Sequence, residues 1–206
     1  MPRPRSLTPH QLATAALTVI DRDGLPGLSM RAVATELGIA TMSLYRYVPD
    51  RQALERQVVD LVLGTVHTAP PPGEPWQRQL AHLLDRVRAA VAAHPGVVPL
   101  TVSHRHTSAA VQLWSEAVLR VLTAAGFTPR RRALALRALL AYLTGALQNE
   151  HLAPLSGEAT TALADLPPEA YPLLSRTATE AARVPAAEEF HAGLDLLLTG
   201  LSAAPR

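Results

Sequence analysis

The sequence predicts an all-α protein, with an N-terminal three-helix helix-turn-helix domain and a larger helical domain. Apolar residues recur with the α-helical period in nearly every segment, and alternating strand patterns are scarce. Hydrophobic residues make up 48% of the 206 residues, which is enough to bury a sizeable core. We place the domain division at residues 1–52 and 53–206.

The first helix has a clear beginning and end in the sequence. Thr8 is a favourable cap residue, and Pro9 fits the first helical position because its fixed φ suits a helix and its missing N–H has no partner there. The helix is expected to run to about Arg22, and Gly24 ends it.

Two short helices separated by a glycine follow. One begins near Ser29, and Gly38 provides the left-handed conformation that a tight interhelical turn needs. The next is expected over residues 41–47, so that a helix-turn-helix spans 29–47. Asp50 then caps a fourth helix.

The rest of the chain predicts longer helices divided by proline and glycine. The Pro-rich stretch 69–75 and the Pro, Ala, Thr and acid-rich stretch 154–172 interrupt the helical pattern, and we expect the second to be mobile. The expected helices cover about 50–65, 76–93, 107–125, 129–152 and 186–201.

Composition excludes several classes of protein. The chain has no Cys, which rules out disulfides and Cys-ligated zinc. No apolar run approaches the ~20 residues of a membrane span, and no apolar stretch follows the basic N-terminus as in a signal peptide. We therefore expect a cytoplasmic protein with no membrane partner.

The excess positive charge lies at the N-terminal end. Residues 1–56 contain seven Arg and five acidic residues, a balance of +2, which equals the formal net charge of the whole chain. Residues 57–206 are balanced, so a polyanion is expected to dock on the first quarter of the chain.

The helix-turn-helix residues suit contact with DNA. A short helix fits the major groove, where Thr and Ser bind phosphates or base edges and a methionine contacts a thymine methyl. Arg31 and Arg51 flank this helix and suit phosphate contacts. An alternative is that Tyr45 and Tyr47 fill gaps in the core and that the arginines are only solvated. The candidate DNA-binding residues are Ser29, Arg31, Thr41, Met42, Ser43, Tyr45, Arg46, Tyr47 and Arg51.

The run from Gly24 to Leu54, GLPGLSMRAVATELGIATMSLYRYVPDRQAL, resembles the DNA-binding domain of the TetR family. It has an apolar-Ser-x-Arg entry, an Ala-x-x-Leu-Gly turn, a Leu-Tyr-x-aromatic reader and an Arg-x-x-Leu helix start. Further along, His67, Trp76-Gln77, Gly126-Phe127 and the closing run from Phe190 are similar to the tetracycline-repressor branch.

The resemblance implies a ligand-responsive repressor that binds palindromic, double-stranded operator DNA as a homodimer. Helices 129–152 and 186–201 would pair with their copies in a four-helix interface, and both have more apolar surface than a monomer easily covers. The helix over 50–65 would link an effector pocket to the DNA-binding domain. A small-molecule inducer would release the DNA.

The effector pocket is expected to differ from that of a tetracycline repressor. His67 corresponds to a drug-contacting histidine, but Leu83 and Val118 stand where amide side chains are expected. We therefore expect a larger or more apolar effector than a magnesium–tetracycline chelate, and no cofactor or metal centre. The candidate ligand-binding residues are His67, His82, His104, Trp114, Tyr142 and Gln148.

Several of these residues have other interpretations. Trp114 has the helical spacing of a core residue, and Tyr142 and Gln148 fit the dimer interface. His104 and His106 could be a pair of metal ligands, but the alternative is that they lie in a solvated loop, since no carboxylate is nearby in the sequence.

Two other functions remain open from the sequence. An enzyme is disfavoured because the chain has no His-Glu-x-x-His motif, no phosphate-binding glycine loop and no Cys nucleophile. An activator, or a ligand-independent DNA-binding protein of the same fold, has the same sequence features as a repressor.

Overall fold

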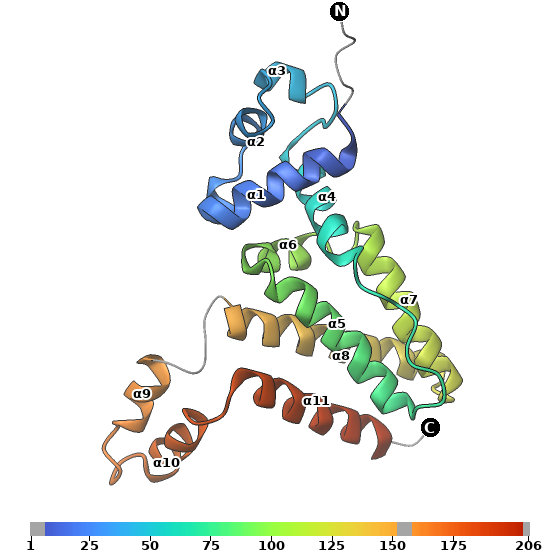
Figure 1. The fold of residues 1–206 in the computed structure, drawn as a ribbon. Coiled ribbons are helices and arrows are strands. Elements are labelled where there is room, and N and C mark those ends of the chain that lie inside the picture. The colour runs from blue at the N-terminus through green and yellow to red at the C-terminus, as the bar shows by residue number, and fades with distance from the viewer. Residues whose placement is uncertain (1–6, 152–157, 204–206) are drawn as a thin grey trace, which may run out of the picture. The chain divides into compact units, whose positions relative to one another are not determined.

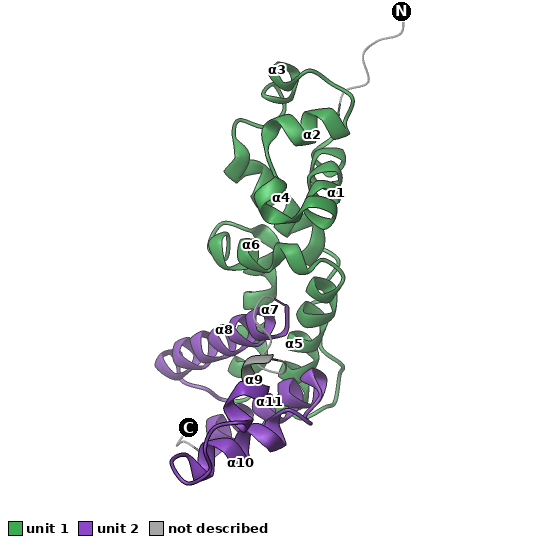
Figure 2. Cartoon of the chain, turned by 90° about the vertical axis from the view of Figure 1, so that its left-hand side faces the viewer, with its two compact units in different colours: residues 1–125 green, residues 126–206 purple. Residues whose placement is uncertain are grey.

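The computed structural model describes residues 7–151 and 158–203, and every regular element among them is a helix, which confirms the predicted fold class (Figure 1). Contacts divide the chain into two compact units, residues 1–125 and 126–206 (Figure 2). The predicted division at residue 52 concerns function and stays a prediction. No helix in the described ranges combines the length and hydropathy needed to cross a bilayer.

The first unit contains seven α-helices and one 3₁₀ helix among its described residues. We call α1–α4 the head and η1 with α5–α7 the body. The elements are α1 (Pro9–Gly27), α2 (Met30–Glu36), α3 (Thr41–Leu44), α4 (Arg51–Leu63), α5 (Trp76–Ala92), η1 (Pro95–Val97), α6 (Val98–Ser103) and α7 (Ala109–Ala124).

Helix α1 starts where the sequence predicts, but it ends at Gly27 rather than at Gly24. The Thr8 hydroxyl accepts a hydrogen bond from the Gln11 backbone N–H, and the Gln11 side chain accepts one from the Thr8 N–H. This reciprocal capping box satisfies two N–H groups that lack helical partners. At Gly24 the backbone takes φ +72°, which interrupts the helix before a last short turn.

The turn between α2 and α3 depends on Gly38, which has φ +66°. In this conformation the Gly38 N–H donates to the Thr35 carbonyl and the Ile39 N–H to the Ala34 carbonyl, both in α2. Without a Cβ, glycine adopts it at no steric cost. The predicted extent of the third helix, 41–47, is wrong in one respect, because α3 ends at Leu44 and residues 45–47 form a hydrogen-bonded turn.

The head has a core of its own. Helix α4 begins at the predicted cap, where the Asp50 carboxylate accepts a hydrogen bond from the Ala53 N–H at 2.7 Å. Apolar side chains from all four helices are almost fully buried, so the short α3 is held by its neighbours rather than by its own length. These side chains are Leu12, Ala16, Val19, Ile20, Val33, Leu44, Leu54 and Val58.

The body contains the predicted α5 and α7, and both bury one face. Leu80, Leu83 and Val87 of α5 and Val118 and Leu122 of α7 are buried. The sequence patterns did not predict η1 and α6, which occupy residues 95–103 after the expected break at His94.

The second unit contains α8 (Pro129–His151), α9 (Glu158–Ala164), α10 (Pro172–Ala181) and α11 (Ala186–Ala203). Arg131 near the start of α8 donates a hydrogen bond to the Leu201 carbonyl, and the Tyr142 hydroxyl donates one to the Phe190 carbonyl at 2.6 Å. The start of α8 therefore lies beside the end of α11 and the middle of α8 beside the start of α11, so the two helices are antiparallel.

Helices α9 and α10 were not predicted. Helix α9 lies inside the stretch 154–172 for which composition predicts mobility, and residues 152–157 lie outside the described residues. The two helices are joined by a hydrogen bond from the Ser175 hydroxyl to the Ala164 carbonyl at 2.9 Å.

Candidate nucleic-acid interface and its links to the body

Residues 41–47, which we call the reading ridge, have all their side chains except that of Leu44 exposed or half-buried at the surface of the head. Leu44 and the neighbouring Val48 are fully buried and hold the segment to the core. By contrast, 76% of Met42, 46% of Tyr45 and 38% of Tyr47 are exposed. Tyr45 and Tyr47 therefore do not fill the core, which was the alternative interpretation of this segment.

Polar and cationic groups surround these apolar side chains. Arg46 is exposed between the two tyrosines, and Thr41 and Ser43 are half-buried. A duplex lying against this surface meets a guanidinium, two hydroxyls of the ridge and two phenols within one short segment. Such groups bind base edges and phosphates in the major groove.

The predicted flanking residues lie on α2 and α4. Ser29 caps α2, and its hydroxyl accepts a hydrogen bond from the Ala32 N–H at 3.1 Å. Arg31 and Ser29 line a shallow depression on α1 and α2. Arg51 is exposed at the first turn of α4, where its Nε donates to Glu55 at 2.7 Å.

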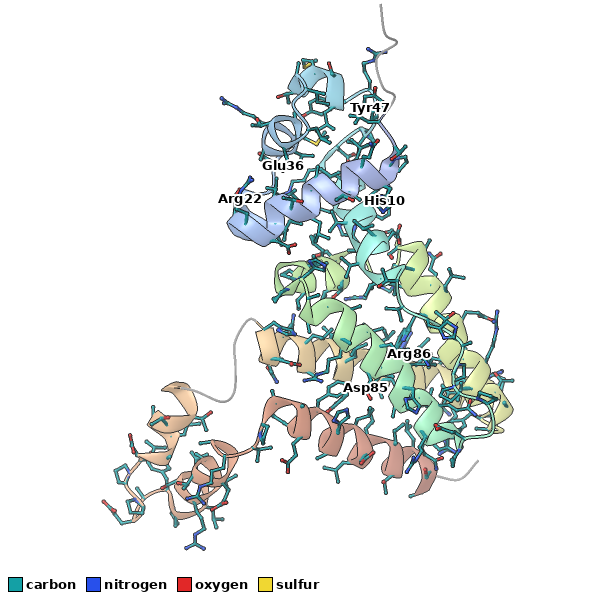
Figure 3. All side chains as sticks on the ribbon, in the orientation of Figure 1. His10, Arg22, Glu36, Tyr47, Asp85 and Arg86 are labelled. Carbon is teal, nitrogen blue, oxygen red and sulfur yellow. The ribbon has the colours of Figure 1, made fainter. Side chains whose placement is uncertain are left out.

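Another arginine of the head, Arg22, is held by acidic neighbours. Its guanidinium contacts Asp23 at 3.0 Å and Glu36 at 2.9 Å, and Figure 3 shows Arg22 of α1 and Glu36 of α2 side by side. The hydrogen bond from Arg22 lowers the pKa of Asp23 below its usual value. The pair with Glu36 joins α1 to α2.

Helix α4 connects the head to the body through two carboxylates. Asp60 accepts hydrogen bonds from the Ser108 hydroxyl at 2.5 Å and from the Ala110 N–H at 3.1 Å. These donors lie at the N-terminus of α7, where N–H groups lack helical partners, so Asp60 caps α7 from another helix. Glu55, one and a half turns earlier on α4, contacts the His104 Nε2 at 3.1 Å.

A second connection joins α1 to η1. His94 Nδ1 lies 2.9 Å from the Asp21 carboxylate. Beside this pair, a Cβ added to Gly96 would lie 2.7 Å from the Ile20 methyl Cγ2, so glycine permits the close approach of η1 to α1. The head is thus fixed to the body at α1 as well as at α4.

Three of the predicted ligand-binding residues have partners within the body. His67 is exposed, and Arg86 donates to its carbonyl at 2.7 Å. His82 pairs with Glu74 at 3.1 Å. Trp114 is buried, and its indole N–H donates to the Leu83 carbonyl at 2.9 Å, as the core interpretation predicts.

The remaining candidates are distributed over different helices. His104 is buried at the end of α6 with its Nε2 against Glu55. Tyr142 and Gln148 belong to the second unit, where Tyr142 bonds to Phe190 of α11 and Gln148 is exposed on α8. Four of the six predicted residues thus lie in the first unit and two in the second, and their role in ligand binding stays a prediction.

A groove of about 330 Å³ lies between α8 and α11. Its floor depends on Gly193, because a Cβ there would lie 2.6 Å from the Tyr142 hydroxyl oxygen. Leu134 of α8 and Leu196 of α11 are 57% and 78% exposed. Both helices thus have apolar side chains that the described residues leave uncovered.

The contacts between head and body are the functional features that the sequence analysis missed. Glu55, Asp60 and Asp21 are ordinary helix-surface carboxylates in the sequence, and their partners lie 49, 48 and 73 residues away. Among residues 7–151 and 158–203, no group of three or more His or acidic side chains is arranged to hold a metal ion.

The fold and the exposed ridge define a helix-turn-helix regulator with a helical body. Comparison with known proteins agrees with this class. Residues 69–204 match the family described as Tetracyclin repressor-like, C-terminal domain. The chain is 31% identical over 202 residues to the class E tetracycline repressor protein of Escherichia coli, covering 96% of this chain and 92% of that protein.

Two further similarities extend this result. The HTH-type transcriptional repressor DrrR1 of Streptomyces coeruleorubidus is 32% identical over 165 residues, which is 80% of this chain and 60% of DrrR1. The crystal structure of the Streptomyces coelicolor TetR family protein ActR in complex with actinorhodin superimposes with a TM-score of 0.84 at 25% identity, covering 97% of each chain. The chain belongs to the TetR family of transcriptional regulators.

Proposed function

We propose that this protein is a dimeric transcriptional repressor that binds palindromic operator DNA and is released from it by a small-molecule effector. The observation that carries the proposal is the reading ridge, whose side chains are exposed while Leu44 and Val48 hold it to the core. Membership of the TetR family supports the same role. We further propose that the protein acts in the cytoplasm and has no catalytic activity.

The ridge supplies the sequence-reading contacts. Arg46 suits a guanine edge, and Met42 suits a thymine methyl. Arg31 and Arg51 bind phosphates on either side of the groove and fix the register of the ridge without reading the sequence.

Dimerisation uses α8 and α11. A four-helix interface between two copies would cover Leu134, Leu196 and the groove beside Gly193. Uncovered apolar surface of this kind on a helix pair favours a symmetric contact between copies. For each ridge to enter one of two successive major grooves, the dimer must hold the two ridges about one helical turn of DNA apart, ~34 Å.

The effector acts on the body. ActR, at 25% identity, was crystallised with actinorhodin, and the effector of the present protein is proposed to be of comparable size or apolarity rather than a magnesium–tetracycline chelate. We propose that it binds next to α4, α5 and α7. The effector can release DNA only to the extent that it binds the non-DNA conformation more tightly.

Two observations would separate this proposal from its alternatives. An activator would protect a site upstream of a promoter, whereas a repressor protects the core promoter itself. A ligand-independent protein would keep its DNA affinity with every compound tested.

Footprinting of the DNA that flanks the gene, with purified protein and a panel of cellular metabolites and aromatic antibiotics, tests the proposal. The expected result is a protected palindrome over the core promoter that one compound class abolishes. Lack of protection anywhere in that DNA, at protein concentrations where the dimer is intact, would contradict it.

A further inference from the structure

One carboxylate at the junction of head and body bonds on two sides. The Glu55 Oε1 accepts the Arg51 Nε–H at 2.7 Å, and its Oε2 contacts the His104 Nε2 at 3.1 Å. Only 13% of the Glu55 side chain and 10% of the His104 side chain are exposed. Arg51 is 46% exposed, so the chain of contacts runs from a buried residue of the body to a cation at the surface of the head.

We infer that His104 is a positioning residue that sets the phosphate contact of Arg51 through Glu55. The inference rests on the proposed function, because it describes the regulation of the same DNA interface. It gives His104 a role in transmission, in place of the ligand contact expected from the sequence.

The geometry of the guanidinium explains the effect. A free carboxylate binds an arginine in a fork, with two parallel N–H···O bonds. Because His104 holds the second oxygen of Glu55, Arg51 donates to this carboxylate through Nε, and its Nη2 donates to the Leu25 carbonyl at 3.4 Å. The other Nη N–H groups of this side chain, which is 46% exposed, can then donate to a phosphate.

Loss of the His104 contact changes this arrangement. The Glu55 Oε2 becomes available to Arg51, and the carboxylate draws the guanidinium into a fork and away from the DNA. An effector that moves the end of α6 would withdraw a phosphate contact in the same way. Meanwhile the Asp60 contacts with Ser108 and Ala110 keep the C-terminal half of α4 in place.

A double-mutant cycle tests the inference without knowledge of the operator or the effector. The probe is a random-sequence duplex of about two helical turns, whose binding reports phosphate contacts. His104→Phe preserves most of the ring volume and removes the nitrogen. We expect it to weaken binding about two- to tenfold, the range of a single hydrogen bond, and to have no effect when Arg51→Ala is also present. His104→Gln, which retains an N–H donor for Glu55, is expected to restore most of the affinity.

His94→Phe is the matched control. It breaks the other histidine–carboxylate pair of the same junction, but its partner Asp21 has no recorded contact with Arg51. We expect its effect on binding to be the same with and without Arg51→Ala. Melting curves verify that each variant folds, and His104→Leu replaces His104→Phe if the aromatic ring is not accommodated.

The outcomes separate the inference from the proposed function. Failure of the unsubstituted protein to bind any duplex would overturn both. The inference alone would be overturned if Arg51→Ala left DNA affinity unchanged, or if His104→Phe weakened binding equally with Arg51 present and with Arg51→Ala. The inference also requires that His104→Phe lower the salt dependence of binding as much as Arg51→Ala does.

Discussion

Gly38 is the position where one added methyl group should damage both stability and DNA binding. Its φ of +66° costs an L-residue about 1–2 kcal/mol. No atom lies within 4 Å of a Cβ built there, so the whole cost comes from the backbone and none from a clash. The smaller entropy of an unfolded chain with Ala offsets about 0.4–1 kcal/mol of it.

The net loss for Gly38→Ala is therefore about 1 kcal/mol per subunit, which lowers Tm by about 2–4 °C for a chain of this length. If the turn relieves its strain by leaving the left-handed region, the Ile39 N–H bond to the Ala34 carbonyl breaks and α3 turns away. Operator binding must then restore the strained form in both subunits. We expect the affinity for a selected operator to fall about fivefold per subunit, the equivalent of about 1 kcal/mol.

Melting curves at fixed protein concentration and anisotropy titrations measure the two effects. Gly73→Ala is the matched control, because Gly73 also has a positive φ, +78°, and an open surrounding but lies in the loop before α5. It should lose similar stability and keep operator affinity. Gly38→Asn should lose less than Gly38→Ala, since Asn tolerates the left-handed region. Equal operator affinities for Gly38→Ala and the wild type would refute the reasoning.

Three further predictions follow from the site and the second unit. Arg46→Ala and Tyr47→Ala should each cost about 1–3 kcal/mol of specific DNA binding and change non-specific binding little, whereas Arg31→Ala should weaken specific and non-specific binding and lower the salt slope by about one unit. Gel shifts over a salt series measure these effects, and an unchanged operator preference in Arg46→Ala would contradict the base-reading role of Arg46. Leu196→Glu, at an exposed position of α11, should dissociate the dimer, while Leu113→Glu at an exposed position of α7 should not, as measured by sedimentation at micromolar concentration. A dimer that persists in Leu196→Glu would exclude this face of α11 from the dimer interface. Gly193→Ala should lower Tm because its Cβ would lie 2.6 Å from the Tyr142 hydroxyl, and adding Tyr142→Phe should recover part of the loss; no recovery would show that this oxygen is not the obstacle.

The head could be predicted from the sequence because its signals are local. The Thr8 cap, the Gly38 turn and the Asp50 cap each act within a few residues, and the structure has all three. The ends of two helices differ, because α1 continues past Gly24 to Gly27 and α3 stops at Leu44. The segment after Leu44 is held by buried Val48 and by turn hydrogen bonds, which helical periodicity does not reveal.

The links between head and body could not be predicted in the same way. Glu55 contacts His104, and Asp21 contacts His94, across 49 and 73 residues, and only folding brings them together. The partners of two predicted ligand-binding residues were likewise not visible in the sequence. His104 contacts Glu55 and the Trp114 indole N–H donates to the Leu83 carbonyl, across 49 and 31 residues.

Selection of binding sites from a pool of random duplexes tests the central claim most directly. The account predicts that the purified protein enriches one palindrome, whose half-sites are centred about one helical turn apart, ~34 Å, and that each duplex holds a twofold-symmetric dimer. Enrichment of no sequence, or of a single half-site held by one subunit, would contradict it.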